Sequence, residues 1–151
     1  ITYLKARGRF CYLATVMDVC SRRILGHALG HDRSVNLTTR AVQQAIRSRP
    51  DAGQLLFHSD RGIEYGAYRY KAFLGEHGIR SSMNRPGQPG DNAHMESFFH
   101  SMKAEWIRGK TFKTITELDI AVKQYIRFYN HHRLHSGLDY RTPVEYERLY
   151  R

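Results

Sequence analysis

Residues 55–62 read LLFHSDRG, an apolar run that is followed by an acid at Asp60 and then by a turn. Residues 92–99 read NAHMESFF and open a long amphipathic run, with Glu96 near its start. An acid at the end of a strand and an acid on a helix can converge on one point, and 35 residues separate these two. Because hard divalent cations bind carboxylate oxygens, the pair Asp60 and Glu96 predicts a metal site that acts on a phosphodiester.

The composition favours a polyanionic partner. Lys and Arg number 24 against 14 Asp and Glu, which gives a net charge of +10 with neutral histidines. The 151 residues, 41% of them hydrophobic, suffice for one domain with its own core. No apolar run approaches the ~20 residues of a membrane span, and Cys11 and Cys20 suit buried free thiols. We therefore expect a single cytoplasmic domain over residues 1–151 that binds a polyanion and no membrane.

Upstream of the Asp60 stretch, the pattern predicts a meander of three antiparallel strands and then a helix. The strands are expected at residues 1–5, 10–16 and 24–29. The turn Arg7–Arg9 joins the first two into a hairpin. Ser34 is the expected N-cap of the helix, which stops before Arg49-Pro50.

Downstream, a strand, a helix and another strand predict parallel pairing with a right-handed crossover. The two strands are expected at residues 54–60 and 79–83. The helix between them ends at Gly78 and carries Tyr65, Tyr68, Ala72 and Phe73. Residues 84–91 contain two Pro and two Gly, so we expect a mobile loop beside Glu96. The fold class is therefore α/β, with a five-stranded mixed sheet flanked by helices.

The remaining chain predicts three helices. The first has an apolar stripe, which consists of Met95, Phe98, Phe99, Met102 and Trp106. A polar stripe lies beside it and consists of Asn92, Glu96, His100 and Lys103. A capping box at Thr116–Asp119 and a Thr142-Pro143 cap followed by Glu145 predict two further helices. We expect these C-terminal helices, residues 116–151, to pack on the same domain.

Two carboxylates are few for a pair of metal ions, so a third acid is expected. Asp18, at the end of the second predicted strand, is the local candidate. However, the sequence from Asp18 to Arg22 suits an aspartate that caps a turn with its side chain on nearby backbone amides. The local pattern favours this structural role.

Several motifs together resemble the catalytic core of bacterial insertion-sequence transposases related to retroviral integrases. They are ITYL at 1–4, DVCSRR at 18–23, HSDRG at 58–62 with Tyr65, DNA at 91–93 with ESFF at 96–99, and YNHHRLH at 129–135 followed by Thr142-Pro143 and Glu145. The resemblance implies a ribonuclease H-like fold and an Asp, Asp, Glu triad whose last two members are Asp60 and Glu96. It places the first acid immediately before Ile1, outside the given sequence.

The resemblance also implies partners and DNA-contacting residues. Mg2+ or Mn2+ would be bound by Asp60 and Glu96, and the protein would act on transposon ends and target DNA as a homo-oligomer. Asn92 and Lys103 match DNA-contacting positions, although Lys103 by itself suits an ordinary solvated lysine. Arg85 is assigned to the same DNA-binding face from its charge. Glu64 departs from the uncharged residue common at its position, and a carboxylate there would repel phosphate unless paired.

The sequence predicts a DNA transposase core that cleaves DNA and transfers strands. Two alternatives stay open: a structure-specific nuclease of the same fold, and an inactive DNA-binding or assembly module, since the first acid is absent. His131, His132 and His135 invite a zinc site, but without a cysteine pair near them they favour a basic, hydrogen-bonding helix end. His58 is expected to be satisfied by backbone rather than to bind a metal, although its proximity to Asp60 leaves a role in supporting the metal ligands open.

Overall fold

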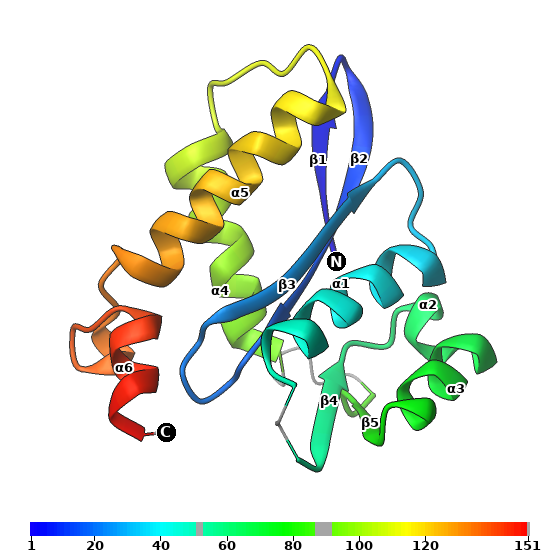
Figure 1. Ribbon diagram of the computed structural model, residues 1–151. Helices are drawn as coiled ribbons and strands as arrows, with labels where there is room; N and C mark the ends of the chain where they lie inside the picture. Colours follow the sequence, from blue (N-terminus) through cyan, green and yellow to red (C-terminus); the bar gives the residue numbers. More distant parts are fainter. Residues whose placement is uncertain (51–52, 87–91, 151) are drawn as a thin grey trace.

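The computed structural model describes residues 1–50, 53–86 and 92–150 (Figure 1). Its strands are β1 (Thr2–Ala6), β2 (Arg9–Met17), β3 (Ile24–Gly30), β4 (Leu55–Ser59) and β5 (Ile79–Met83). Its helical elements are α1 (Val35–Ser48), α2 (Ile63–Gly66), α3 (Tyr68–Glu76), α4 (Ala93–Met102), the π-helical turn η2 (Lys103–Ile107), α5 (Ile115–His131), the 3-10 turn η3 (Ser136–Leu138) and α6 (Pro143–Tyr150).

The first three strands form the predicted antiparallel meander. β1 pairs with β2 from Thr2↔Leu13 to Ala6↔Arg9, and β2 pairs with β3 along its second half. Arg7 and Gly8 connect the hairpin with φ values of 50° and 73°. Positive φ at both central positions matches the right-handed twist of the flanking strands, and Gly8 adopts it without steric cost.

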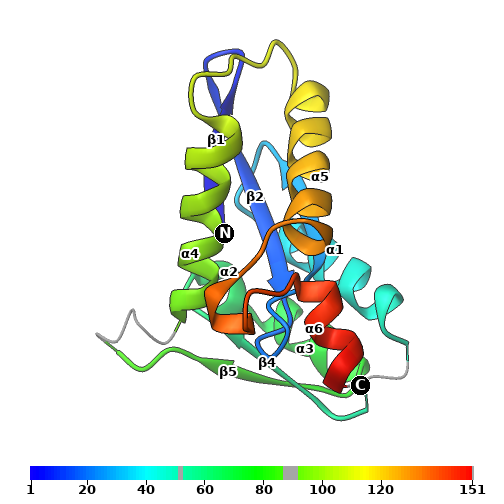
Figure 2. The same ribbon diagram turned by 90° about the vertical axis from the view of Figure 1, so that its left-hand side faces the viewer.

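Helices cover both faces of this sheet, as Figures 1 and 2 show. One face packs against α4 and α5, and its core includes Leu13 of β2, Phe98 of α4 and Val122 of α5, all at most 1% exposed. The other face packs against α1, where Ala14 and Ala28 meet Ala41. Successive strand residues point to opposite faces, so the alternation along β2 divides its side chains between the two cores.

The expected helix start signals are confirmed in two cases and wrong in the third. Ser34 Oγ accepts from the backbone N–H of Leu37 at 3.3 Å. Thr142 and Glu145 cap one another, since each backbone N–H donates to the other side chain. The capping box expected at Thr116–Asp119 lies two residues earlier, because the Thr114 side chain, rather than Thr116, accepts from the Glu117 N–H at 3.1 Å.

The helix expected to carry Tyr65 and Tyr68 is divided into α2 and α3. Ala67 between them is extended, with ψ 138°, which rotates the second helix relative to the first. Tyr65 is therefore buried, whereas Tyr68 is 88% exposed and Tyr70 takes the inward position. The cysteine prediction is correct for Cys11, which is buried, and wrong for Cys20, which is exposed.

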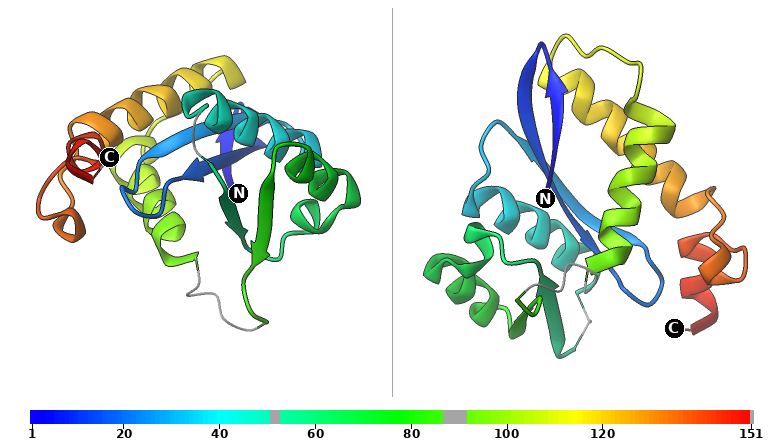
Figure 3. Two further views of the ribbon diagram at one scale, coloured as in Figure 1. Left: turned by 60° about the horizontal axis from the view of Figure 1, so that its bottom comes forward. Right: turned by 180° about the vertical axis from the view of Figure 1, so that it is seen from behind.

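The five strands do not form one hydrogen-bonded sheet, which corrects the expected five-stranded arrangement. β4 and β5 pair in parallel, as predicted, but as a separate two-stranded sheet (Figure 3). The pairing of β1 stops at Thr2, so Ala14–Met17 of β2 pair with β3 alone among the described strands. A pocket separates this part of β2 from β4. The mixed α/β class is unchanged.

The remaining expectations concern α4 and membranes. Phe98 and Met102 are buried, with Met95, Phe99 and Trp106 packed around them, which confirms the apolar stripe.

The expected loop at residues 84–91 falls largely on residues 87–91, outside the described residues. Within the described ranges, no helix is long and apolar enough to cross a membrane.

Candidate functional site

Asp60 lies directly after β4, at the carboxyl end of the strand, as predicted. Its Oδ1 accepts a hydrogen bond from the backbone N–H of Gly62 at 2.8 Å. The loop is fixed further by Arg61, whose Nε donates to the carbonyl oxygen of Asn84 at 2.9 Å. Asn84, directly after β5, contacts the residues on both sides of Asp60, since its own N–H donates to the Ser59 carbonyl oxygen at 2.9 Å.

Glu64 lies four residues after Asp60 and is 2% exposed. Its carboxylate is held by Arg33, whose Nε lies 3.1 Å from both carboxylate oxygens and whose Nη2 lies 3.0 Å from Oε1. A carboxylate at this position was expected to repel phosphate unless it was paired. The structure shows that it is paired, with an arginine from the segment that leads from β3 into α1.

Two further groups, at Ile1 and Tyr65, lie close enough to the carboxylates at this end of β4 to interact with their charge. The backbone nitrogen of Ile1 lies close enough to the carboxylates of Asp60 and Glu64 to interact with them electrostatically. Burial raises the pKa of the Tyr65 phenol well above its ordinary value, and Asp60 and Glu64 raise it further. The backbone start of β1 therefore lies close to Asp60, inside a largely apolar environment.

Glu96 lies in the first turn of α4 and is exposed. A carboxylate in the first turn is favoured by the partial positive charge of the helix N-terminus. Figure 1 shows this end of α4 near the N-terminus of the chain and the end of β4. In residues 1–50, 53–86 and 92–150, no group of three or more His, Cys, Asp or Glu side chains is arranged to hold a metal ion. The convergence of Asp60 with Glu96 therefore remains a prediction.

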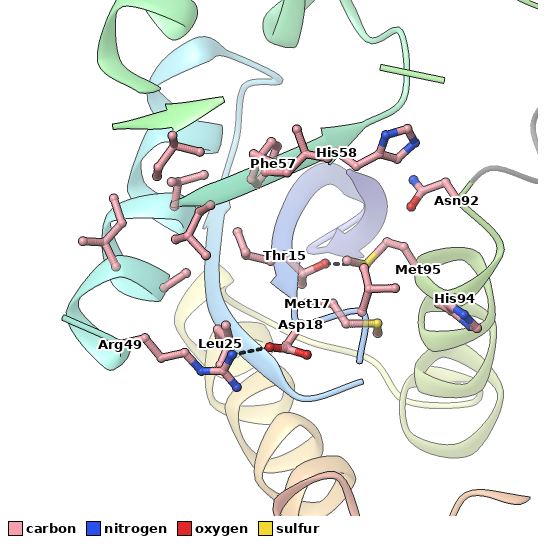
Figure 4. A pocket seen from close by; sticks show the side chains of 18 residues that line it. Thr15, Met17, Asp18, Leu25, Arg49, Phe57, His58, Asn92, His94 and Met95 are labelled. Atoms are coloured by element: carbon pink, nitrogen blue, oxygen red, sulfur yellow. Dashed lines mark hydrogen bonds and ion pairs between the residues drawn. The ribbon is translucent and has the colours of Figure 1, made fainter. Parts of the chain in front are cut away.

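A pocket of about 310 Å³ lies between β2, β4, α1 and the start of α4. Figure 4 shows His58 and Asn92 at one end of it and the ion pair of Arg49 with Asp18 at the other. Backbone groups were expected to satisfy the His58 ring, but side chains of the β5 region do so instead. Ser82 Oγ lies 3.0 Å from Nδ1, and Asn84 Oδ1 lies 2.8 Å from Nε2. Both ring nitrogens are thus engaged.

Asp18 caps the turn after β2, which confirms the interpretation made from its sequence. Its Oδ1 accepts from the Ser21 N–H at 2.9 Å, and its Oδ2 pairs with Arg49 at the end of α1. Burial acts to raise the pKa of Asp18, but the hydrogen bonds from Ser21 and Arg49 lower it by more. The carboxylate is therefore committed to holding a turn and a helix end.

The three residues assigned to DNA contact lie in different settings. Asn92 precedes α4 and lines the pocket, and its side chain makes no cap hydrogen bond. Lys103 follows α4, and its Nζ lies 4.6 Å from the centre of the exposed Tyr3 ring, while partial burial lowers its pKa. Arg85 is exposed directly after β5 and its Asn84 neighbour. Lys103 is thus not the freely solvated lysine that its helix position alone suggested.

The histidines at and after the end of α5 lie in different environments. His131 and His132 are exposed, but His135 is 7% exposed. Burial and then the neighbouring Arg133 lower the pKa of His135 to about 4. His135 is therefore neutral at pH 7, which corrects the expected basic helix end at this position.

Comparison with known proteins identifies the family. Residues 1–89 match the integrase core domain family, and residues 77–143 match a second integrase core domain family. The chain belongs to the integrase core domain family. This agrees with a mixed α/β core in which an acid follows β4 and another lies in the first turn of α4.

Relatives of this integrase core domain include bacterial transposases. The chain is 38% identical over 150 residues to the transposase for insertion sequence element IS904 of Lactococcus lactis, covering 98% of this chain and 59% of the relative. It is 35% identical over 146 residues to the putative transposase InsK for IS150 of Escherichia coli, covering 97% and 52%. The chain thus spans little more than half the length of these relatives.

Solved structures confirm the fold. The catalytic core domain of HTLV-2 integrase in complex with magnesium, in a trimeric form, is 15% identical to this chain with a TM-score of 0.66, covering 95% of this chain and 89% of that one. The integrase core domain described here therefore has the ribonuclease H-like fold expected from the resemblance.

Sequence reasoning missed Arg33. It lies 31 positions before Glu64 and looks like an ordinary loop arginine. The available signal was Glu64 itself, because an unusual acid that is buried requires a cation partner.

Proposed function

We propose that this integrase core domain is the catalytic part of a DNA transposase, which cleaves at the element end and then transfers the freed strand to target DNA. The observation that carries this proposal is Asp60, an acid held by the Gly62 N–H at the carboxyl end of β4 in a chain of this family. Relatives named as insertion-sequence transposases support it.

Asp60 and Glu96 are the proposed catalytic acids and metal ligands. Carboxylate oxygens are the donors that Mg2+ and Mn2+ prefer, and water and phosphate oxygens commonly complete their coordination. The bound cation would stabilise charge that develops on the phosphate. The Gly62 N–H orients Asp60, and the first turn of α4 favours the charge of Glu96. A related core solved with magnesium supports this choice of cofactor.

The first acid of the triad is proposed to precede Ile1 directly. The proximity of the Ile1 backbone nitrogen to Asp60 supports this, since a side chain attached one residue earlier would lie in the same neighbourhood. Both strand cleavage and joining would then be in-line displacements at phosphorus, without a covalent protein intermediate.

DNA is the proposed partner, as both transposon end and target. The net charge of +10 provides attraction that does not depend on base sequence. Asn92, Lys103 and Arg85 are the proposed DNA contacts. A homo-oligomer is proposed for the active complex, which the trimeric form of the related core supports.

The test is a strand-transfer assay with precleaved element ends and Mg2+, using a protein that includes the residue before Ile1. Joined product that falls to background in Asp60→Asn and Glu96→Gln, but not in Asp18→Asn, is the expected result. Cleavage of an intact element end, with no joined product from the precleaved end, would indicate a nuclease instead. DNA affinity that is indifferent to metal and to both acid substitutions would indicate an inactive DNA-binding module.

A further inference from the structure

The end of β4 carries two carboxylates close together. Gly62 lies between Asp60 and Glu64 in the sequence, and both carboxylates approach the side of Gly62 where a side chain would lie. A Cβ built on Gly62 would lie 2.9 Å from Asp60 Oδ1, 2.5 Å from Glu64 Oε1 and 2.8 Å from Arg33 Nη2. The three charged groups therefore surround one point, at a residue whose missing side chain makes the approach possible.

Two like charges in such proximity repel, most strongly where water is excluded. The Glu64 side chain is 1% exposed, so solvent does little to screen it. Arg33 compensates this charge with a two-pronged contact through Nε and Nη2, a geometry that fixes the guanidinium as well as neutralising the acid. The guanidinium also lies close enough to Asp60 for their charges to interact.

We propose that Arg33 and Glu64 form a charge-compensating pair that sets the electrostatic potential at Asp60, with Arg33 as a positioning residue for that carboxylate. The pair leaves the end of β4 with the net charge of one acid and holds Gly62 where its N–H reaches Asp60. The inference rests on the proposed function, since it concerns the site at which Asp60 meets a divalent cation.

The main alternative is that Glu64 is itself a metal ligand and that Arg33 merely stands in for the cation. The two cases differ in how charge removal acts. If Glu64 acts through charge, the loss of cation affinity caused by removing it is restored when Arg33 is removed as well. If Glu64 is a ligand, its loss is not reversed.

The experiment measures the Mn2+ affinity of the protein, with the residue before Ile1 included, by the electron paramagnetic resonance signal of free Mn2+. We expect Arg33→Gln to tighten binding roughly three- to tenfold and Glu64→Gln to weaken it by a similar factor, because each leaves one charge uncompensated near the cation. The double variant Arg33→Gln with Glu64→Gln should return close to wild type. Arg33→Lys loses the two-pronged contact but keeps the positive charge, so an effect that acts through charge should leave the affinity within about twofold of wild type.

Each outcome decides one question. A double variant that binds as weakly as Glu64→Gln would show that Glu64 is a ligand, and single variants with wild-type affinity would show that the pair is only structural; either overturns the inference. Asp60→Asn is the separate control for the proposed function: if it leaves Mn2+ affinity unchanged, the metal site itself is refuted. Thermal unfolding of every variant identifies any that fail to fold. If a single variant does, the double variant, which preserves net charge, still separates a Glu64 that binds the cation, whose loss weakens Mn2+ affinity, from a Glu64 that acts through charge.

Discussion

The side-chain amide of Asn130 in α5 pairs with both backbone groups of Ile24 in β3. The Ile24 N–H donates to Asn130 Oδ1 at 2.9 Å, and Asn130 Nδ2 donates to the Ile24 carbonyl oxygen at 2.9 Å. A helix side chain thus takes the place of a neighbouring strand at the start of β3. Since both groups are buried, the contact fixes where α5 crosses the sheet.

Asn130→Ala should therefore be strongly destabilising. It leaves a buried N–H and a buried carbonyl oxygen without partners, at an expected cost of about 2–4 kcal/mol in the free energy of unfolding. Urea denaturation followed by circular dichroism measures this. Gln124→Ala, on the exposed side of the same helix, should change stability by less than about 0.5 kcal/mol. Equal effects of the two substitutions would contradict the role of Asn130.

Asp18→Asn tests a structural carboxylate against the proposed catalytic one. The substitution should lower the free energy of unfolding at pH 7 by about 1–3 kcal/mol, because Asn cannot pair as a charge with Arg49. The pKa of Asp18 is lowered in the folded protein, so its contribution is complete above the unfolded value of about 3.9 and is lost as pH falls through the folded pKa. The stability difference from wild type should shrink below about pH 4. Urea midpoints at pH 7 and pH 3 measure it, and loss of Mn2+ affinity in this variant would contradict the assignment.

His135 should make stability fall between pH 6.5 and pH 4. Its folded pKa of about 4 lies below the unfolded value of about 6.5, so the unfolded state binds more protons in this window. The folded protein accommodates the neutral imidazole. The stability that depends on His135 being neutral is therefore fully present above about pH 6.5 and is lost as the pH falls toward 4. Wild type should lose about 2 kcal/mol between pH 7 and pH 5 that His135→Phe does not lose. Urea denaturation at both pH values provides the comparison, and His132→Gln, at an exposed position, should behave as wild type. A His135→Phe variant with unchanged pH dependence would refute this.

The parts of this fold that the sequence predicted correctly are those with local signals. Alternation places β1, β2 and β3, and Ser34 and Thr142 mark helix starts because their hydroxyls lie beside the backbone groups that they cap. The position of Asp60 at a strand end follows from the apolar run before it. Each of these depends on residues within a few positions of one another.

The features that sequence reasoning missed depend on contacts between distant residues. Arg33 with Glu64 and Asn130 with Ile24 join positions 31 and 106 residues apart, and neither pair has a sequence motif. The neutral state of His135 follows from its burial in the folded chain, which the surrounding HHRLH sequence does not indicate. The separation of β4 from β2 likewise depends on which strands form hydrogen bonds with one another. The alternation of apolar and polar residues predicts where strands lie but not which strands pair.

Gly26 is a close-packing position between β3 and α1, and Gly26→Ala should destabilise the protein by about 1–3 kcal/mol. A Cβ there would collide with the Ala41 carbonyl oxygen and lie 2.7 Å from the Ala45 amide nitrogen, both backbone atoms that can move only if α1 moves away from the sheet. Gly75→Ala is the matched control, because a Cβ there meets nothing within 4 Å and Ala favours the helix that contains it. Gly75→Ala should be neutral or stabilising by up to about 1 kcal/mol. Thermal unfolding of the two variants compares them directly, and a Gly26→Ala variant as stable as wild type would show that α1 can shift at no cost.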